Sequence, residues 1–155
     1  MKMIKVLAER LNRKVAPMHT VPYNATITEI ASLFVENNIG AALVEKEVHE
    51  DGVYAGIISE KDIIKCCAEH GDLNKLPVHK IMQREMITAN ILDEVKPTVR
   101  KMREHHIRHI PLIEHGKIIA LISIRDLMYC VDMEQEIAMS HMNDMFGGTR
   151  RDSSY

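Results

Sequence analysis

The sequence of 155 residues lacks the charge pattern that points to a nucleic-acid partner. It has 20 basic against 22 acidic residues, and no block of Lys or Arg provides the positive surface that a phosphate backbone requires. The same balance gives no support for binding to a charged membrane surface. We therefore expect no nucleic-acid partner and no membrane association.

Cysteines and long apolar runs are also few. The three cysteines are Cys66, Cys67 and Cys130, without a C-x-x-C pair. An odd number suits a reducing compartment better than a disulfide framework, and we expect Cys66 and Cys67 to serve in packing. The apolar run within residues 1–7 is too short for a signal peptide, and no later stretch is long enough to span a bilayer. We expect a cytoplasmic protein.

Catalytic motifs are missing as well. The sequence has no P-loop, no paired-acid motif and no evident nucleophile with its base. Four histidines lie close together in the sequence: His105, His106, His109 and His115. The spacing of His105 and His109 would suit a metal only if the segment stayed helical through both residues. We expect neither an enzyme nor a metal site.

What the sequence does have is an internal repeat. The segment GIISEKDII at residues 56–64 recurs as ALISIRDLM at residues 120–128, at an offset of 64. Upstream, residues 37–44 recur as residues 105–112 at an offset of 68. The difference of four residues fits a longer loop in the first copy, around residues 48–52, because loops tolerate insertions.

Each copy has the same pattern of predicted elements: a strand, a helix, two more strands and a closing helix. The strands are predicted over 18–21, 41–45 and 53–58, and over 86–89, 110–113 and 117–122. Helical spacing is seen in the apolar positions Ile27, Ile30, Ala31, Phe34 and Val35, and again in Val95, Val99 and Met102. Closing helices are predicted from Glu60 to about His70 and from Ile124 onward. The segment 114–117, with Gly116, predicts a tight hairpin. The fold class is therefore α+β.

The repeat also sets the predicted domain organisation. We expect the first copy over residues 1–72 with an N-terminal helix, and the second over residues 73–131 with a linker. Residues 132–155 are expected to form a Met-rich helix with a disordered end. The methionines predict either packing against a partner subunit or a surface that recruits another protein.

The two copies resemble a known family. Residues 107–113 with 121–127, and residues 39–44 with 56–63, are similar to the CBS repeat. The resemblance implies two tandem CBS repeats (β-α-β-β-α), packed as a pseudo-twofold module that usually forms a homodimer. It also implies clefts that bind AMP, ADP, ATP or S-adenosylmethionine, no required cofactor, and regulation of a protein that the sequence does not identify.

Two Ser-x-x-Asp segments are the first candidate site residues: Ser59 to Asp62, and Ser123 to Asp126. By itself this spacing predicts a capping box, in which Ser begins a helix and Asp reaches back to its N–H. The resemblance implies that each Asp also accepts hydrogen bonds from a ribose diol. The two roles can coexist.

The candidate phosphate-binding cations differ between the copies. The resemblance implies that three side chains of the second copy reach the phosphate of a nucleotide held by Asp62: Arg108, His109 and Arg125. For the cleft of Asp126, the equivalent positions are Gly40, Ala41 and Lys61, of which only Lys61 is a cation. We therefore expect the Asp62 cleft to bind a phosphorylated adenosine better. The alternative is that these cations are solvated surface or dimer contacts.

Adenine recognition is expected from apolar side chains, as in most small-molecule pockets. The candidates are Met86, Ile87 and Ile107 on one side, and Ile39 near the other cleft. Two residues depart from the family pattern. Gln83 follows Met82 where many members have Thr, and Ala120 stands where the first copy has Gly56.

Two functions are consistent with these features. In the first, an adenosine-containing ligand changes the conformation of a dimer, and a partner protein reads that change. In the second, the clefts are empty or vestigial, and the protein is a scaffold that acts through dimerisation and partner binding.

Overall fold

The computed structural model describes Ile4, residues 18–69 and residues 71–146. The described residues form two lobes with the same order of elements. The first lobe contains β1 (Thr20–Val21), α2 (Ile27–Asn37), β2 (Ala41–Glu50), β3 (Val53–Ser59) and α3 (Glu60–Glu69). After the short helix η1 (Val78–Lys80), the second lobe contains β4 (Ala89–Asn90), α4 (Val95–Glu104), β5 (His109–Glu114), β6 (Lys117–Ser123) and α5 (Ile124–Phe146). The predicted α+β repeat is confirmed.

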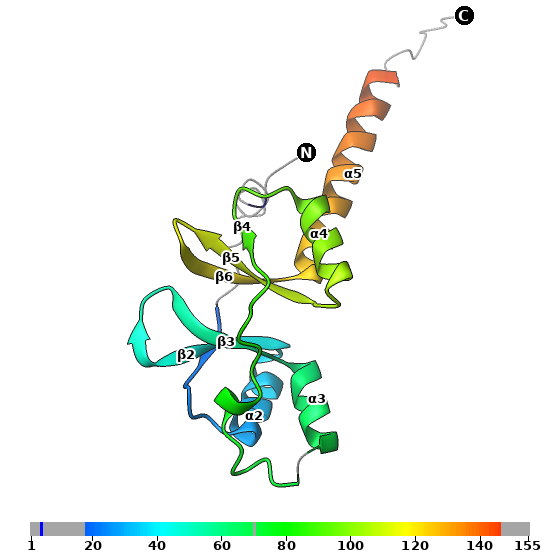
Figure 1. The fold of residues 1–155 in the computed structure, drawn as a ribbon. Coiled ribbons are helices and arrows are strands. Elements are labelled where there is room, and N and C mark those ends of the chain that lie inside the picture. The colour runs from blue at the N-terminus through cyan, green and yellow to red at the C-terminus, as the bar shows by residue number, and fades with distance from the viewer. Residues whose placement is uncertain (1–3, 5–17, 70, 147–155) are drawn as a thin grey trace, which may run out of the picture.

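Each lobe has one sheet of three strands among the described residues. In both sheets the short first strand runs parallel to the second, and the second and third form an antiparallel hairpin. The sheets meet in the middle of the molecule, with the helices on their outer sides (Figure 1). β3 contacts β6 across this junction, and the Ile118 N–H donates to the Gly52 carbonyl at 2.9 Å. The two hairpins therefore hold the lobes together.

Helix α2 begins at a complete capping box. The Thr26 hydroxyl accepts from the Glu29 N–H at 3.3 Å, and the Glu29 carboxylate accepts from the Thr26 N–H at 2.7 Å. The buried face of α2 is formed by Ile27, Ile30 and Phe34. The prediction that Val35 belongs to this face is wrong, because its side chain is 83% exposed. At 3.6 residues per turn, Val35 lies about 100° around the helix from Phe34.

The first strand of the second lobe is later and shorter than predicted. We expected it over residues 86–89, but β4 is Ala89–Asn90. In the first lobe, the Leu43 N–H donates to the His19 carbonyl and extends the pairing of β1 with β2. Pro111 stands at the position equivalent to Leu43 and has no N–H to donate. Pairing in the second lobe therefore starts only at Ala89, opposite Leu112.

The hairpin between β5 and β6 forms where it was predicted. Its two central residues, His115 and Gly116, have φ angles of 49° and 76°. Positive φ at both central residues is the signature of a type I′ turn, whose twist matches that of the flanking strands. Glu114 pairs with Lys117 across this turn.

Each hydrophobic core is completed by residues that come just before the other lobe in the sequence. Val78 and Met82, which follow the first lobe in sequence, are buried in its core. The Val78 N–H donates to the Ala25 carbonyl at 2.8 Å, which fixes this segment on the first lobe. Ile4 is buried in the core of the second lobe, and its N–H donates to the Asp93 carbonyl at 3.1 Å. The boundaries at residues 72 and 131 stay a prediction.

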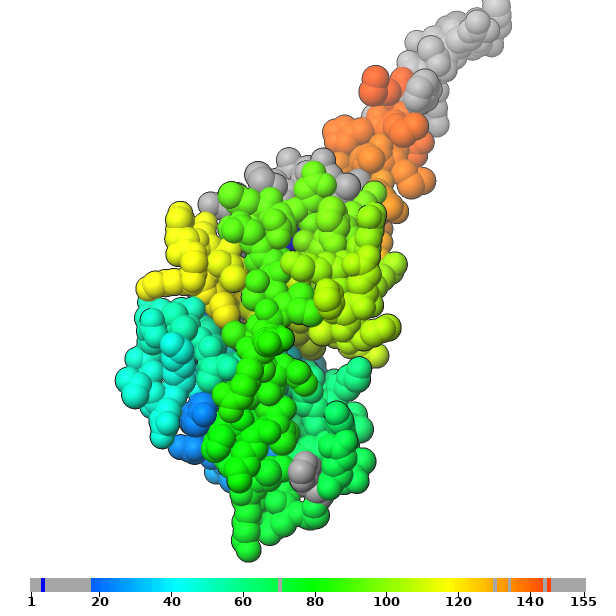
Figure 2. Space-filling view, in the orientation of Figure 1, coloured from blue at the N-terminus to red at the C-terminus, as the bar shows by residue number. Residues whose placement is uncertain are grey.

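Helix α5 continues without a break well past the body of its lobe (Figures 1 and 2). This confirms the helix predicted from Ile124 onward and its extension beyond Asp132. Its distal half carries exposed apolar side chains: Ile137, Met139, Met142 and Met145. Among the described residues, no helix is both long and apolar enough to cross a bilayer. The predicted N-terminal helix and disordered end lie outside the described residues.

The adjacent cysteines of α3 do not share one environment. Cys66 is buried in the core of the first lobe, where burial raises the pKa of its thiol. Cys67 is exposed, so the prediction that both residues pack is wrong for Cys67. Neighbouring helical residues point about 100° apart, so a helix with one buried face cannot bury both.

We predict that Gly56→Ala destabilises the protein. Gly56 is buried on β3, and a Cβ there would lie 2.5 Å from the Gln83 carbonyl oxygen and 3.0 Å from Met82. The backbone of one segment would have to move, at a cost of about 1–3 kcal/mol in the free energy of unfolding. Urea denaturation measures this loss. Gly71→Ala is the control, because nothing lies within 4 Å of its Cβ position. Equal stability of Gly56→Ala and wild type would contradict the prediction.

Candidate functional site

The two Ser-x-x-Asp segments form the first turns of α3 and α5. The Asp62 Oδ2 atom accepts from the Ser59 N–H at 2.8 Å and from the Ser59 hydroxyl at 2.7 Å. In the second lobe, the Asp126 Oδ2 atom accepts from the Ser123 N–H at 3.3 Å and from its hydroxyl at 2.6 Å. The predicted contact of Asp with the N–H of its Ser is thus confirmed in both lobes, and in the second lobe the Ser123 hydroxyl also accepts from the Asp126 N–H at 3.2 Å. Each carboxylate is half-buried and fixed at a helix N-terminus, where the positive end of the dipole stabilises its charge.

A second backbone contact is repeated at the start of each closing helix. The Glu60 N–H donates to the Gly40 carbonyl at 3.0 Å, and the Ile124 N–H donates to the Arg108 carbonyl at 2.7 Å. These bonds occupy N–H groups that the first turn of a helix leaves without an intrahelical partner. They also place the residues just before β2 and β5 beside the helix starts. Gly40 and Arg108 are therefore equivalent in the two lobes.

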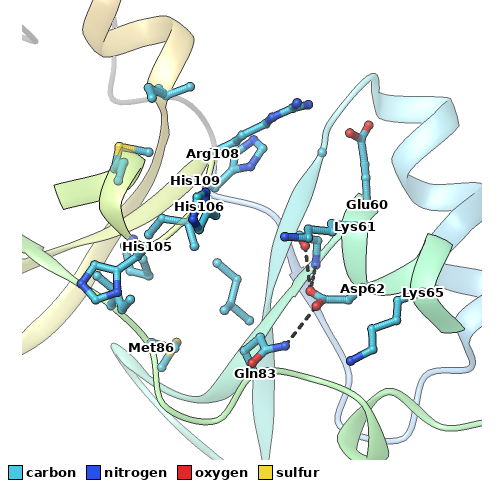
Figure 3. Close-up of a pocket in the computed structure, with 18 of the residues that line it drawn as sticks. Glu60, Lys61, Asp62, Lys65, Gln83, Met86, His105, His106, Arg108 and His109 are labelled. Carbon is cyan, nitrogen blue, oxygen red and sulfur yellow. Dashed lines mark hydrogen bonds between the residues drawn. The ribbon is translucent and has the colours of Figure 1, made fainter. Parts of the chain in front are cut away.

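A cavity of about 950 Å³ lies between the lobes at Asp62. This volume is within the range of small-molecule sites. Figure 3 shows Asp62 and Lys61 on the side of α3, with Arg108 and the neighbouring histidines coming from the second lobe. The cavity brings together eight of the predicted site residues: Ser59, Lys61, Asp62, Met86, Ile87, Ile107, Arg108 and His109. The predicted convergence of Asp62 with Arg108 is therefore present.

The apolar wall of the cavity is larger than predicted. Besides Met86, Ile87 and Ile107, it includes further side chains from both lobes: Ile57, Ile64, Met102, Pro111 and Ile124. Ile64 is a large aliphatic residue on α3 and is 70% exposed. Its place in the cavity wall accounts for that exposure.

The charged lining is mixed rather than uniformly positive. Among the described residues, the cavity is lined by four cations, namely Lys61, Lys65, Arg103 and Arg108, and by three carboxylates, namely Glu60, Asp62 and Glu85. Lys65 and Arg103 were not predicted as site residues. Lys65 lies one helical turn after Lys61 on α3, so the spacing i, i+4 could have indicated it. No equivalent signal pointed to Arg103, which is near the end of α4.

The predicted division of the cations between the clefts is wrong for two residues. Lys61 was assigned to the Asp126 cleft but lines the Asp62 cavity, and Arg125, assigned to the Asp62 cavity, is exposed outside its lining. Each is the second residue of a closing helix, one position before its own Asp. Lys61 therefore lines the same cavity as the Asp that follows it on α3. Arg108 and His109 do come from the opposite lobe.

The remaining predicted residues lie elsewhere. Ser123 and Asp126 form the cap of α5 and do not line the cavity at Asp62. Ile39 is half-buried against the core of the first lobe. These three residues were assigned to the second cleft, and their role in a ligand site stays a prediction.

His109 lies at the junction of the lobes. A Cβ added at Gly40 would be 3.0 Å from its Cε1 atom and 3.2 Å from the Glu60 carboxyl carbon, so the imidazole packs over a position without a side chain. Burial lowers the pKa of His109, and the nearby charges of Glu60 and Asp126 oppose part of that effect. The charge of Arg108 lowers the pKa further.

The segment from His105 to His109 does not have the helical geometry that a metal-binding pair at this spacing requires. His105 follows the last residue of α4, and His106 has a φ of 53°, so the segment does not stay helical through His109. Within residues 18–69 and 71–146 together with Ile4, no three His, Cys, Asp or Glu side chains are arranged to hold a metal ion.

Gln83 is a cavity residue to which the sequence analysis assigned no role. Its side-chain Nε2 donates to the Asp62 Oδ1 at 3.1 Å, and it lines the cavity (Figure 3). The sequence contained a signal, because the family resemblance led us to expect Thr after Met82, where this chain has Gln83.

The family model for the CBS domain matches the chain twice, over residues 9–69 and 78–132. The chain belongs to the CBS-domain family. It is 30% identical over 108 residues to the CBS domain-containing protein YhcV of Bacillus subtilis, covering 70% of this chain and 74% of that protein. Three other curated relatives are longer, and the chain spans 26 to 42% of their lengths.

Solved structures of CBS proteins superpose on both lobes. A putative signal-transduction protein with CBS domains from Burkholderia ambifaria has a TM-score of 0.76 and 28% identity, covering 87% of this chain and 96% of that one. The CBS domain protein PAE2072 from Pyrobaculum aerophilum, complexed with AMP, has a TM-score of 0.70 and 28% identity. The latter match covers 88% of this chain and 98% of that one.

We predict that the lowered pKa of His109 makes this CBS pair less stable in mild acid. The pKa of His109 is lowered in the folded protein, so the unfolded chain binds more protons below about pH 6.5. The free energy of unfolding should therefore decrease as the pH falls through that region. Urea denaturation between pH 5.5 and 7.5 should give a smaller slope for His109→Gln than for wild type. Identical slopes would show that His109 does not contribute.

Proposed function

We propose that this CBS pair is a regulatory module that binds an adenosine-containing ligand at Asp62 and catalyses no reaction. One observation carries the proposal. A carboxylate fixed at the start of α3 shares a cavity with Arg108 and His109 from the opposite lobe. An acceptor for a diol, a cation for a phosphate and an apolar wall for a base are the three features that a nucleotide requires.

Each part of a nucleotide has a counterpart in the cavity. The Asp62 carboxylate would accept from the ribose hydroxyls, and the Arg108 guanidinium would donate to the phosphate. Met86, Ile87 and Ile107 would contact the adenine. The AMP complex of the 28% identical relative from Pyrobaculum aerophilum supports AMP as the first ligand to test, ahead of ADP, ATP and S-adenosylmethionine.

Binding in this cavity provides a means of regulation. The ligand would contact both lobes at once, so it would favour the arrangement of lobes that best fits it. We propose that the protein forms a homodimer, that the ligand changes the conformation of this dimer, and that a partner protein reads the change. The exposed apolar side chains on the distal half of α5 could contact that partner or the second subunit.

We predict that AMP raises the melting temperature of the protein. A ligand at a hundred times its Kd stabilises the folded state by about 2.7 kcal/mol. For a chain of this size, that corresponds to a shift of about 5–10 °C. Differential scanning fluorimetry with AMP, ATP and S-adenosylmethionine measures it, and Asp62→Asn should reduce the shift. A flat response to all ligands would contradict the proposal and favour the scaffold function, for which the exposed face of α5 is the supporting observation.

We predict that the phosphate contact comes from Arg108. Loss of a charge-assisted hydrogen bond at this exposed position should weaken AMP binding about tenfold in Arg108→Ala, measured by isothermal titration calorimetry. Arg100→Ala is the matched control, because Arg100 is exposed on α4 and does not line the cavity. Asp126→Ala should have a smaller effect than Arg108→Ala. Equal losses in these two variants would show that the Asp62 cleft is not the preferred one.

A further inference from the structure

The hydrogen bonds that Asp62 accepts within the protein leave few acceptor positions on its carboxylate for a ligand. An ionised carboxylate has about four acceptor positions, two on each oxygen. The Ser59 N–H and hydroxyl occupy both positions on Oδ2, at 2.8 and 2.7 Å. The Gln83 amide donates to Oδ1 at 3.1 Å. Three of about four positions are therefore filled by the protein's own donors, and about one remains.

The backbone of Gln83 is held independently of its side chain. The Ile57 N–H donates to the Gln83 carbonyl, and the Gln83 N–H donates to the Ile57 carbonyl, both at 2.9 Å. This pair joins the segment before the second lobe to β3, and the missing side chain of Gly56 lets the Gln83 carbonyl approach. The position of the amide in front of α3 is thus fixed by main-chain bonds, and replacing the side chain leaves those bonds in place.

A ribose diol requires more than one acceptor position. The 2′ and 3′ hydroxyls each donate one hydrogen bond when a carboxylate holds both. While the Gln83 amide donates to Asp62, the carboxylate has one acceptor position left and can accept a hydrogen bond from only one of the two hydroxyls. Gln83 is exposed at the cavity edge, so its side chain is free to rotate toward solvent while its backbone stays paired (Figure 3). Binding of both hydroxyls therefore requires the amide to leave Oδ1.

We propose that Gln83 determines the affinity of this cleft for ribose-containing ligands by competing with their diol for Asp62. The inference rests on the proposed function, because it concerns the same cavity. Gln83 keeps the carboxylate occupied in the ligand-free protein and must be displaced by the ligand. A ligand with a single ribose hydroxyl can use the remaining acceptor position and need not displace it.

The test compares two ligands on a small set of variants by isothermal titration calorimetry. Gln83→Ala should bind AMP about 3- to 10-fold more tightly than wild type, since one competing hydrogen bond is removed. Its affinity for 2′-deoxyadenosine 5′-monophosphate should stay within about twofold of wild type, since that ligand needs one acceptor. In an Asp62→Ala background, Gln83→Ala should give no gain in AMP affinity, because both carboxylate oxygens for which the amide and the diol compete have been removed.

The sequence offers a matched control. Its two glutamines are Gln83 and Gln135, and Gln135 is exposed on α5, away from the cavity. Gln135→Ala should therefore bind AMP like wild type. The same pair serves a second measurement, the side-chain amide resonances in a ¹⁵N-labelled sample. Saturating AMP should shift the Gln83 amide signals and leave those of Gln135 in place.

The outcomes separate the two proposals. If wild type binds AMP and Gln83→Ala binds it no more tightly, Gln83 does not compete and this inference is wrong. Weaker binding by Gln83→Ala would also overturn it, because the amide would then support the ligand site. If neither protein binds AMP, ATP or S-adenosylmethionine, the proposed function is wrong, and there is no ligand with which Gln83 could compete. Unchanged Gln83 amide signals at saturating AMP would likewise overturn the inference.

Discussion

The hydrogen bonds from Ser to Asp at the starts of α3 and α5 determine where each closing helix places its first carboxylate. In each lobe, the Ser N–H and hydroxyl both donate to one carboxylate oxygen, which fixes the first turn of the helix at the end of a hairpin. A second bond joins the first helical N–H to the residue before the middle strand, Gly40 in one lobe and Arg108 in the other. These contacts hold a negative charge beside the junction of the two sheets. The chemistry of the cavity follows from that placement.

The general plan of the fold could be predicted from the sequence because it depends on local patterns that occur twice. The apolar spacing of α2, the Gly-containing hairpin at His115 and Gly116, and the two Ser-x-x-Asp segments are all short-range features. The misses came from single residues whose effect depends on a neighbour in space. Pro111 delays the pairing of β4, and Val35 falls outside the face that the core covers. Neither effect changes the order of the elements.

The candidate site was predictable only where the family resemblance names a position. It indicated Asp62, Arg108 and His109, and all three line one cavity. The division of Lys61 and Arg125 between the clefts failed, because the sequence does not say which lobe a residue at a helix start faces. Gln83 shows a different limit. Its contact with Asp62 depends on the pairing of its backbone with Ile57, a contact between segments that no local pattern encodes.

The exchange of core residues between the lobes has a consequence for folding. Ile58 and Ala42 in the first lobe are covered by Val78 and Met82, which the chain supplies only after that lobe is complete, while Ile4 completes the core that contains Leu112. Neither half of the duplication can exclude water from its own interior using its own residues alone. A polypeptide cut between the halves would therefore expose an unfinished core on each fragment, which favours unfolding of the intact domain as one cooperative unit.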